Sequence, residues 1–302
     1  MKLLVTGRKG QVAVSLRERA ATFPDIELIM LGRPELDLGD PHMIAPAIAA
    51  HRPDIIVSAA AYTAVDQAED EAEWAFAINT TGAGLIAVAA ANLNIPVIHL
   101  STDYVFDGDA AGTYTEDDPT GPRCVYGASK LGGELAVKMA NPHHIILRTA
   151  WVYSPFGKNF ARTMLRLADS RKEVAVVSDQ WGNPTSALDI ADAILHVATV
   201  LRDDPRFSAF GVYHLVGTGA TNWSGFARRI FEASMQTGGP FAQVRDIVTA
   251  DYPTRARRPL NSRLATDKFA AFFGGTMPDW RQSTAHVVAR LVGGPTESPG
   301  QQ

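Results

Sequence analysis

Short apolar runs alternate with helical patterns through the first half of the chain, and this alternation most constrains the fold. The runs are apolar at nearly every position, which suits strands of a parallel sheet covered on both faces. Repeated strand-helix units predict an α/β fold with a doubly wound parallel sheet of the Rossmann type. The five predicted strands are KLLVT (2–6), IELIML (26–31), DIIVSAA (54–60), VIHLST (97–102) and HIILRT (144–149).

The alternation of strands and helices ends after Thr149, where irregular loops and longer helical patterns follow. We therefore predict a nucleotide-binding domain over residues 1–150, with a returning segment near 173–200. Residues 151–290 are expected to form mainly a smaller, mixed substrate-binding region interleaved with the first domain. Residues 291–302, rich in Gly, Pro and Gln, are expected to be a disordered tail.

Composition narrows the class of protein. A chain of 302 residues, 46% of them hydrophobic, is long enough for a sizeable core. Its net charge of −4 argues against a nucleic-acid surface, which would carry a basic excess. The single cysteine, Cys124, excludes an internal disulfide and favours a reducing compartment. We find no apolar run of about 20 residues, so no membrane segment is predicted and a cytoplasmic location is expected. The eight histidines lack metal-ligand spacing, so no metal site is predicted.

The first predicted strand ends in VTGRKGQVA, a glycine-rich turn into a helix. Glycine permits the tight turn and lets a pyrophosphate approach the amides at the helix N-terminus. Ala13, in the third position of the pattern, still allows close helix-strand packing. At the first strand of an α/β chain this motif predicts dinucleotide binding through Gly7, Gly10, Gln11 and Val12.

The ends of the next two strands bear on which dinucleotide is bound. An acid about 20 residues after the glycine turn would bind the ribose hydroxyls, whereas an arginine would accept a 2′-phosphate. Arg33 stands where the acid could have stood, which favours NADPH over NADH, although a solvated loop arginine is the alternative. The other residues expected to border the cofactor are Asp37 and Leu38, beside the adenine, and the small Ala59, Ala60 and Ala61. Tyr126 and Lys130 are also expected to contact the cofactor, with Lys130 holding the nicotinamide ribose.

The stretch from Ser101 to Lys130 carries the predicted chemistry. Tyr126 and Lys130 lie four residues apart in YGASK, so a helix would place them on one face. A nearby ammonium is expected to lower the tyrosine pKa, and such a tyrosine exchanges a proton with a substrate oxygen. Thr102 ends the predicted strand 97–102, at the sheet edge where ligands bind. Cys124 has no histidine nearby in sequence and is interpreted as a spacer.

Several motifs occur between Met1 and about Trp280: GxxGQ, AAAYTAVDQAE, STDYVFDG, YGASKLGGE, RTAWVYSPFGKNF, DQWGNPTSALDIA and ARRPLNSRL. Together, and in this order, they resemble the dTDP-4-dehydrorhamnose reductase family of extended short-chain dehydrogenases/reductases. The resemblance implies NAD(P)H-dependent reduction of the 4-keto group of dTDP-4-dehydro-β-L-rhamnose to dTDP-L-rhamnose. It also implies a catalytic triad of Thr102, Tyr126 and Lys130, with Asp103 and Trp151 as substrate contacts. Some members bind magnesium between subunits through acidic residues, but Ser15 stands at one such position here, which argues against that site.

Two further features are predicted to contact the sugar nucleotide. Trp151 follows the strand 144–149, so its indole is expected past the sheet edge, as an apolar face for a deoxysugar; a core tryptophan is the alternative. Four arginines, 255, 257, 258 and 263, lie within nine residues of an otherwise acidic chain. Guanidinium groups suit a diphosphate, and we expect Arg258 to bind it; a solvated, ion-paired loop is the alternative.

Other functions remain open at this stage. A dehydratase of related type carries a glutamate where this chain has Tyr104, a residue able to hydrogen-bond a sugar but a poor replacement for that carboxylate. An epimerase needs no such acid. A regulatory dinucleotide-binding subunit without turnover is a third alternative, which the intact triad disfavours. The sequence does not fix which 4-keto sugar is used or the oligomeric state, for which a homodimer is one option.

Overall fold

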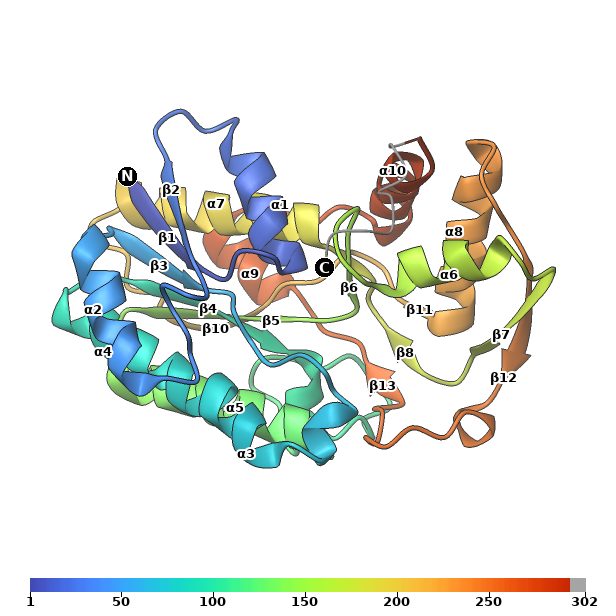
Figure 1. The fold of residues 1–302 in the computed structure, drawn as a ribbon, viewed down its shortest axis with the longest axis horizontal. Coiled ribbons are helices and arrows are strands. Elements are labelled where there is room, and N and C mark those ends of the chain that lie inside the picture. The colour runs from blue at the N-terminus through green and yellow to red at the C-terminus, as the bar shows by residue number, and fades with distance from the viewer. Residues whose placement is uncertain (294–302) are drawn as a thin grey trace.

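The computed structural model describes residues 1–293. The predicted tail begins inside the last helix, α10 (Trp280–Gly293), and its remaining residues, 294–302, lie outside the described part. A six-stranded sheet dominates the structure, and all of its strands are parallel (Figure 1). Its order is β10-β5-β4-β3-β1-β2, with bounds Gly211–His214, His144–Thr149, Val97–Thr102, Ile55–Ser58, Lys2–Thr6 and Glu27–Leu31.

Helices cover both faces of this sheet, as the doubly wound prediction requires. On one face lie α1 (Gln11–Ala20), α7 (Ala187–Asp203) and α9 (Asp267–Phe273), and on the other α2 (Pro41–His51), α4 (Ala83–Asn92) and α5 (Val125–Ala140). Successive strand residues point to opposite faces. Leu3 and Val5 of β1 accordingly join the core under α1 and α7, whereas Leu4 joins the core under α2 and α4. The predicted fold class and all five predicted strands are confirmed.

One helical stretch, Ala72–Asn92, is long and apolar enough to cross a membrane, contrary to the sequence prediction that no such run exists. It consists of α3 (Ala72–Phe76), the π-helical turn η2 (Ala77–Gly82) and α4. Its buried residues Ile86, Ala87 and Ala90 pack in the core beneath the sheet. The apolar composition is therefore used for packing against α2, α5 and the strands.

The C-terminal part has its own core, in which Phe226, Ile230 and Trp280 meet Tyr153 and Val287. It contains α6 (Phe160–Ala168), α8 (Trp223–Gln236) and α10 together with three small sheets. The first pairs β6 with β9, the second pairs β7 with β12, and the third has the order β11-β8-β13. The strand bounds in chain order are Val152–Tyr153 (β6), Glu173–Val177 (β7), Trp181–Gly182 (β8), Thr185–Ser186 (β9), Thr221–Asn222 (β11), Gln243–Ile247 (β12) and Asn261–Ser262 (β13).

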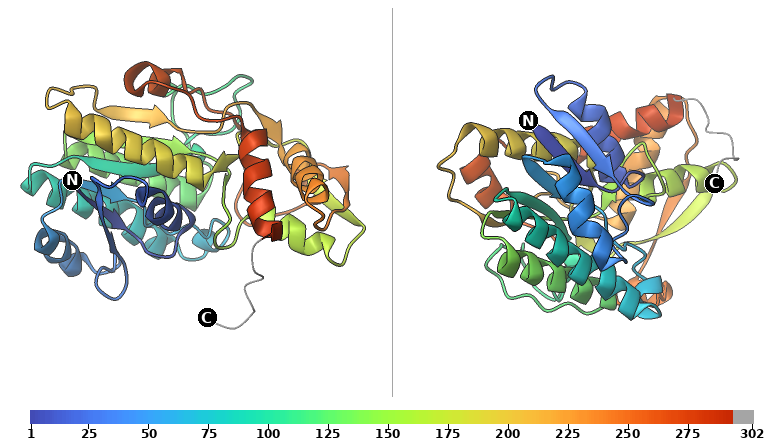
Figure 2. Two further views of the ribbon diagram at one scale, coloured as in Figure 1. Left: turned by 90° about the horizontal axis from the view of Figure 1, so that it is seen from above. Right: turned by 60° about the vertical axis from the view of Figure 1, so that its left-hand side comes forward.

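The chain passes repeatedly between the two parts. Of the segment 173–200, β7 belongs to the C-terminal part, whereas α7 returns to pack against α1. The strand β10, which the sequence analysis did not predict, then completes the large sheet beside β5. The left-hand view in Figure 2 shows the C-terminal part at one end of this sheet. Short helical turns, η1 (Gln67–Glu69), η3 (Asp103–Val105) and η4 (Thr249–Asp251), lie in the connecting loops.

Candidate active site

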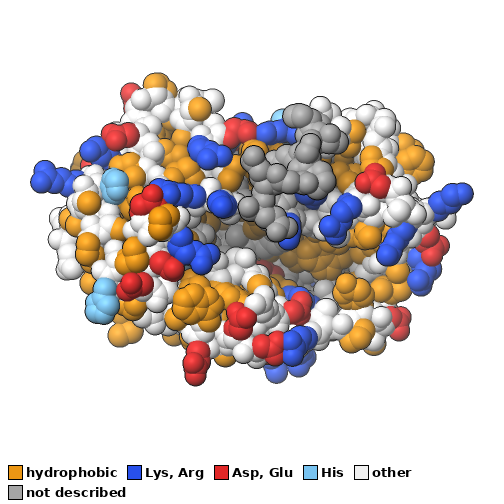
Figure 3. Space-filling view, viewed as in Figure 1, with side chains coloured by type: hydrophobic (Ala, Val, Ile, Leu, Met, Phe, Trp, Pro, Cys, Tyr) orange, Lys and Arg blue, Asp and Glu red, His pale blue; other side chains and the backbone are white. Residues whose placement is uncertain are grey.

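A cavity of about 1010 Å³ lies along the carboxyl edge of the large sheet. Figure 3 shows the molecule hollowed between its two parts, with Lys and Arg side chains beside the hollow. The lining comes from the loops after β1, β2, β3, β4 and β5, and from the start of α5. One continuous space thus joins the predicted cofactor loop to Thr102, Tyr126 and Lys130.

The glycine loop has the geometry that a pyrophosphate needs. Gly7 adopts a φ of +100°, which side chains other than glycine rarely tolerate, and it packs against Ala60. Gly10 precedes α1 and has open space where a Cβ would stand. No side chain caps this helix, so the amides of its first turn remain available to an anionic ligand. The loop therefore fits the pyrophosphate of a dinucleotide.

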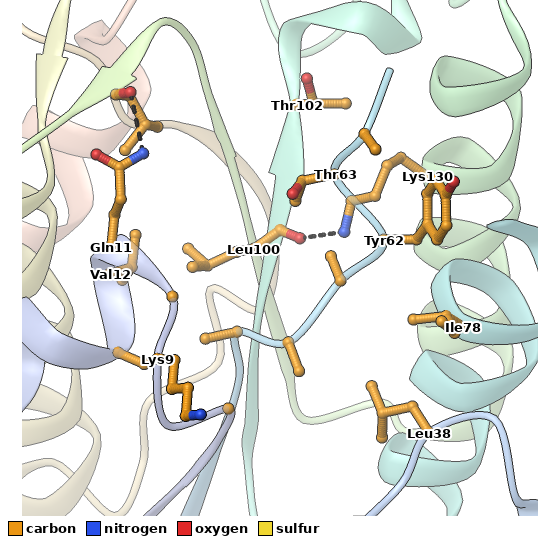
Figure 4. Close-up of a pocket in the computed structure, with 18 of the residues that line it drawn as sticks. Lys9, Gln11, Val12, Leu38, Tyr62, Thr63, Ile78, Leu100, Thr102 and Lys130 are labelled. Atoms are coloured by element: carbon orange, nitrogen blue, oxygen red, sulfur yellow. Dashed lines mark hydrogen bonds between the residues drawn. The ribbon is translucent and has the colours of Figure 1, made fainter. Parts of the chain in front are cut away.

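The remaining residues predicted for the cofactor also line the cavity. Thr6 accepts hydrogen bonds from the amides of Ala59 and Ala60 at 3.1 Å, which fixes the loop after β3 beside the loop after β1. Gln11 links the start of α1 to the C-terminal part. Its side chain donates to the Val152 carbonyl (Figure 4) and accepts from the Ser154 hydroxyl. The other lining residues predicted for the cofactor are Gly7, Gly10, Val12, Arg33, Asp37, Leu38, Ala61, Tyr126 and Lys130.

Sequence reasoning missed several lining residues. Lys9 lies inside the glycine turn, between Gly7 and Gly10 (Figure 4). Its positive charge beside a predicted pyrophosphate site could have identified it. Tyr62 and Thr63 directly follow the predicted alanines, so the same strand-end argument could have included them. Ile78 and Lys158 carried no such signal, because η2 and the loop after β6 reach the cavity only through tertiary folding.

Tyr126 and Lys130 lie on one face of α5, as their spacing predicts, but the predicted effect on the tyrosine is wrong. Burial raises the pKa of the Tyr126 hydroxyl above its ordinary value, and the Thr102 hydroxyl only partly opposes that rise. Lys130 is directed elsewhere: its Nζ donates to the Leu100 carbonyl at 2.6 Å (Figure 4). Desolvation of the hydroxyl thus dominates its pKa, and Tyr126 is protonated at neutral pH.

The last residue of β4 and the two that follow it lie around the tyrosine hydroxyl. Thr102 Oγ1 donates to Asp103 Oδ1 at 2.9 Å and accepts from the Tyr104 amide at 3.2 Å. Burial raises the pKa of the Asp103 carboxyl to about 6, against the lowering effect of the Ser262 and Thr102 hydroxyls. The Tyr104 ring stands edge-on to Tyr126, with 5.6 Å between ring centroids. These four side chains form a compact polar group at the floor of the cavity.

Trp151 lines the cavity on the side of the C-terminal part. Its backbone, two residues past the end of β5, has a φ of +47°, in the left-handed region that residues other than glycine seldom adopt. The ring stacks on Trp223 at a centroid distance of 3.6 Å and an interplanar angle of 8°. Gly182 lies directly against it, because a Cβ there would come within 2.5 Å of Cε2. The indole is therefore held in one orientation by both neighbours.

Arg258, expected to bind the substrate diphosphate, is not among the residues that line the cavity, and its contact with a diphosphate stays a prediction. It pairs with Asp66 and donates to the Tyr104 hydroxyl at 3.2 Å. Arg255 pairs with Asp70, and Arg257 with Asp109 at 3.6 Å. Arg263 donates to Ala111 O at 2.7 Å. The arginine-rich segment is thus fixed to the loops of the nucleotide-binding part, and Arg258 reaches the site through Tyr104.

Residues 1–293 contain no group of three or more His, Cys, Asp or Glu side chains arranged to hold a metal ion. Ser15 is buried within α1.

Comparison with known proteins agrees with this arrangement. Residues 1–292 match the family model described as the RmlD substrate binding domain. The chain is 50% identical to dTDP-4-dehydrorhamnose reductase of Sinorhizobium fredii, over 97% of this chain and 98% of that protein. The chain belongs to the dTDP-4-dehydrorhamnose reductase family.

Two other members of this family show how far the similarity extends. The dTDP-4-dehydrorhamnose reductase of Escherichia coli K12 is 42% identical over 96% of this chain and 98% of that protein. The crystal structure of the enzyme of that name from Bacillus anthracis, in complex with NADP, superposes with a TM-score of 0.88 at 32% identity. That match covers 95% of this chain and 98% of the other.

Proposed function

We propose that this chain reduces the 4-keto group of dTDP-4-dehydro-β-L-rhamnose to dTDP-L-rhamnose, using a nicotinamide nucleotide. The observation that carries the proposal is the single cavity shared by the glycine loop and by Thr102, Tyr126 and Lys130, in a chain 50% identical to a reductase of that name. A nicotinamide, when bound there, supplies the hydride for the keto carbon.

Tyr126 serves as the proton donor. Reduction leaves an alkoxide at the former keto oxygen, which is a stronger base than a phenolate and takes the tyrosine proton. The raised pKa of Tyr126 supports this role, because the hydroxyl carries its proton at neutral pH before the reaction begins. Thr102 offers a second hydroxyl to the same oxygen from the end of β4.

Lys130 keeps the expected task of holding the nicotinamide ribose, but it does not lower the pKa of Tyr126. Burial lowers the pKa of its ammonium to about 8, while the Glu134 carboxylate acts in the opposite direction. With its Nζ bound to Leu100, the lysine lies at the cavity floor, where it holds the nicotinamide ribose and places positive charge near the developing alkoxide. The charge is present below about pH 8.

The substrate and cofactor contacts are proposed on position. Trp151 offers the deoxysugar an apolar face, and Asp103 and Tyr104 offer it polar contacts. Arg33 lines the cofactor end of the cavity, which supports a preference for NADPH. Arg8, its neighbour in space across Gly32, is paired with Glu35 at 2.6 Å, so its charge is already compensated. Arg258 supports the sugar nucleotide through Tyr104.

The decisive experiment incubates the purified protein with the dTDP-4-keto sugar and either NADPH or NADH. We expect loss of nicotinamide absorbance and formation of dTDP-L-rhamnose, identified by NMR of the product. Tyr126→Phe is the matched control, because it removes one hydroxyl from a ring of the same shape. A product with the opposite configuration at C4 would assign a different reductase activity. Cofactor binding without turnover would instead support a regulatory subunit.

A further inference from the structure

A buried polar layer lies beneath the face of α5 that carries Lys130. Alternate residues of a strand share one face, so His99 and Ser101 of β4 both point towards α5. Ser101 donates to Glu134 at 2.6 Å, and Arg148 of β5 binds the same carboxylate through two nitrogens at 2.9 and 2.8 Å. His99 faces Lys130. The proposed reaction assigns no task to this histidine.

The contacts of Lys130 account for two of its three N–H groups. Nζ donates to the Leu100 carbonyl at 2.6 Å and lies 3.4 Å from His99 Nε2. The lysine is 3% exposed, so water does not replace these partners. Because Lys130 also lines the cavity, its third N–H remains for a ligand there.

His99 has a single tautomer that satisfies its neighbours. An ammonium only donates, so Nε2 must accept from it, and the ring hydrogen is then on Nδ1. Nδ1 lies 3.0 Å from Ser58 Oγ, which accepts that hydrogen. Burial and the Lys130 charge keep the pKa of His99 well below its ordinary value, so the ring stays neutral.

The surroundings contain few other charges. Tyr126 and Glu134 flank Lys130 on α5, and Arg148 on β5 pairs with Glu134. The strand β3 contributes only the uncharged Ser58. On the other side of α5, Asn79 and Thr80 of η2 bind Ser129 rather than the lysine. His99 is therefore the side chain through which the sheet holds the ammonium.

We infer that His99 is a positioning residue for Lys130: Ser58 fixes its tautomer, and its Nε2 holds the ammonium with one N–H directed into the cavity. The inference deepens the proposed reductase function and rests on it. His99 itself touches neither substrate nor cofactor. It acts by keeping Lys130 charged and in place, so its loss alters the pH range of activity and not only the rate.

The test measures kcat and the dissociation constant of NADPH against pH for His99→Leu and His99→Gln. Leucine removes the acceptor of the Lys130 N–H and should lower the pKa of the ammonium. The alkaline limb of both profiles should therefore shift to lower pH by about one to two units, the equivalent of one hydrogen bond to a charged group. Glutamine places an oxygen near the position of Nε2 and should restore most of the wild-type profile. Ser58→Ala removes the hydroxyl that holds the ring hydrogen on Nδ1 of His99, and it should give a smaller shift in the same direction.

His214→Leu is the matched control. His214 is a second buried histidine on the same face of the sheet, but its Nδ1 is bound to the Ala265 carbonyl and it does not contact Lys130. Its loss should lower Tm and leave the alkaline limb in place. An unchanged limb in His99→Leu, or equal shifts in the leucine and glutamine variants, would overturn the inference.

Two results would leave the His99→Leu profile unmeasured or the keto sugar unreduced, and each is resolved by another measurement. If His99→Leu does not fold, the Ser58→Ala profile decides, because an unshifted limb there also overturns the inference. If the wild type binds NADPH but does not turn over the keto sugar, the proposed function fails, while the NADPH profile still tests His99.

Discussion

Gly182→Ala should damage the substrate pocket without touching the cofactor site. Gly182 ends β8 and lies against the Trp151 indole. An added methyl group would stand 2.5 Å from Cε2 and 2.8 Å from both Cζ2 and Nε1. Carbon atoms in contact prefer about 3.5–4.0 Å, so the indole must move by about 1 Å. Its stacking on Trp223 at 3.6 Å resists that movement.

The magnitude follows from this overlap. Inserting a methyl group into a packed site costs about 1–3 kcal/mol of stability. A displacement of about 1 Å in a group that positions a substrate costs up to about 10²-fold in rate. We therefore expect kcat/KM for the keto sugar to fall about 10- to 100-fold, with the dissociation constant of NADPH unchanged.

Steady-state kinetics with the dTDP-keto sugar, fluorescence titration of NADPH and thermal unfolding together check this prediction. Gly112→Ala is the matched control, because a Cβ there meets no atom within 4 Å, and its kinetics should match those of the wild type. If Gly182→Ala lowers Tm but leaves kcat/KM for the sugar intact, then Trp151 is a core residue at the junction of the two parts. The assignment of the pocket wall would then be wrong.

Four further outcomes are expected. Tyr126→Phe should cut kcat about 10²- to 10⁴-fold, the usual contribution of general acid catalysis, with NADPH affinity retained; near-normal turnover would exclude the role. Arg33→Ala should weaken NADPH about 10- to 100-fold in binding titrations and spare NADH, whereas equal losses would mark a structural arginine. The wild-type rate should decline above about pH 8 in a pH profile, since the ammonium of Lys130, with a pKa of about 8, loses its proton there; a flat profile to pH 10 would contradict this. Arg258→Ala should raise KM for the dTDP-sugar more than it lowers kcat, because Tyr104 loses its partner in ground and transition states alike; lower Tm with unchanged KM would place the arginine in the fold alone.

The sequence by itself determined the nucleotide-binding framework. The strands 2–6 and 97–102 were predictable because burial on both faces of a parallel sheet demands nearly continuous apolar runs. Gly7 was predictable because a turn at a φ of +100° favours glycine. Tyr126 and Lys130 share a face because a spacing of four residues is close to one helical turn.

Only the tertiary structure decided the electrostatics and the partners of these residues. The sequence predicted a lowered pKa for Tyr126, but the pKa depends on how deeply the hydroxyl is buried, and burial raises it. Arg258 pairs with Asp66, 192 residues away along the chain, a partner that no sequence pattern indicated. In the sequence His99 is one residue of a largely apolar strand, and its contact with Lys130 of α5 is visible only in the folded structure. Local periodicity records which face of an element is buried, whereas the neighbour that a buried polar atom meets is set by contacts between distant segments.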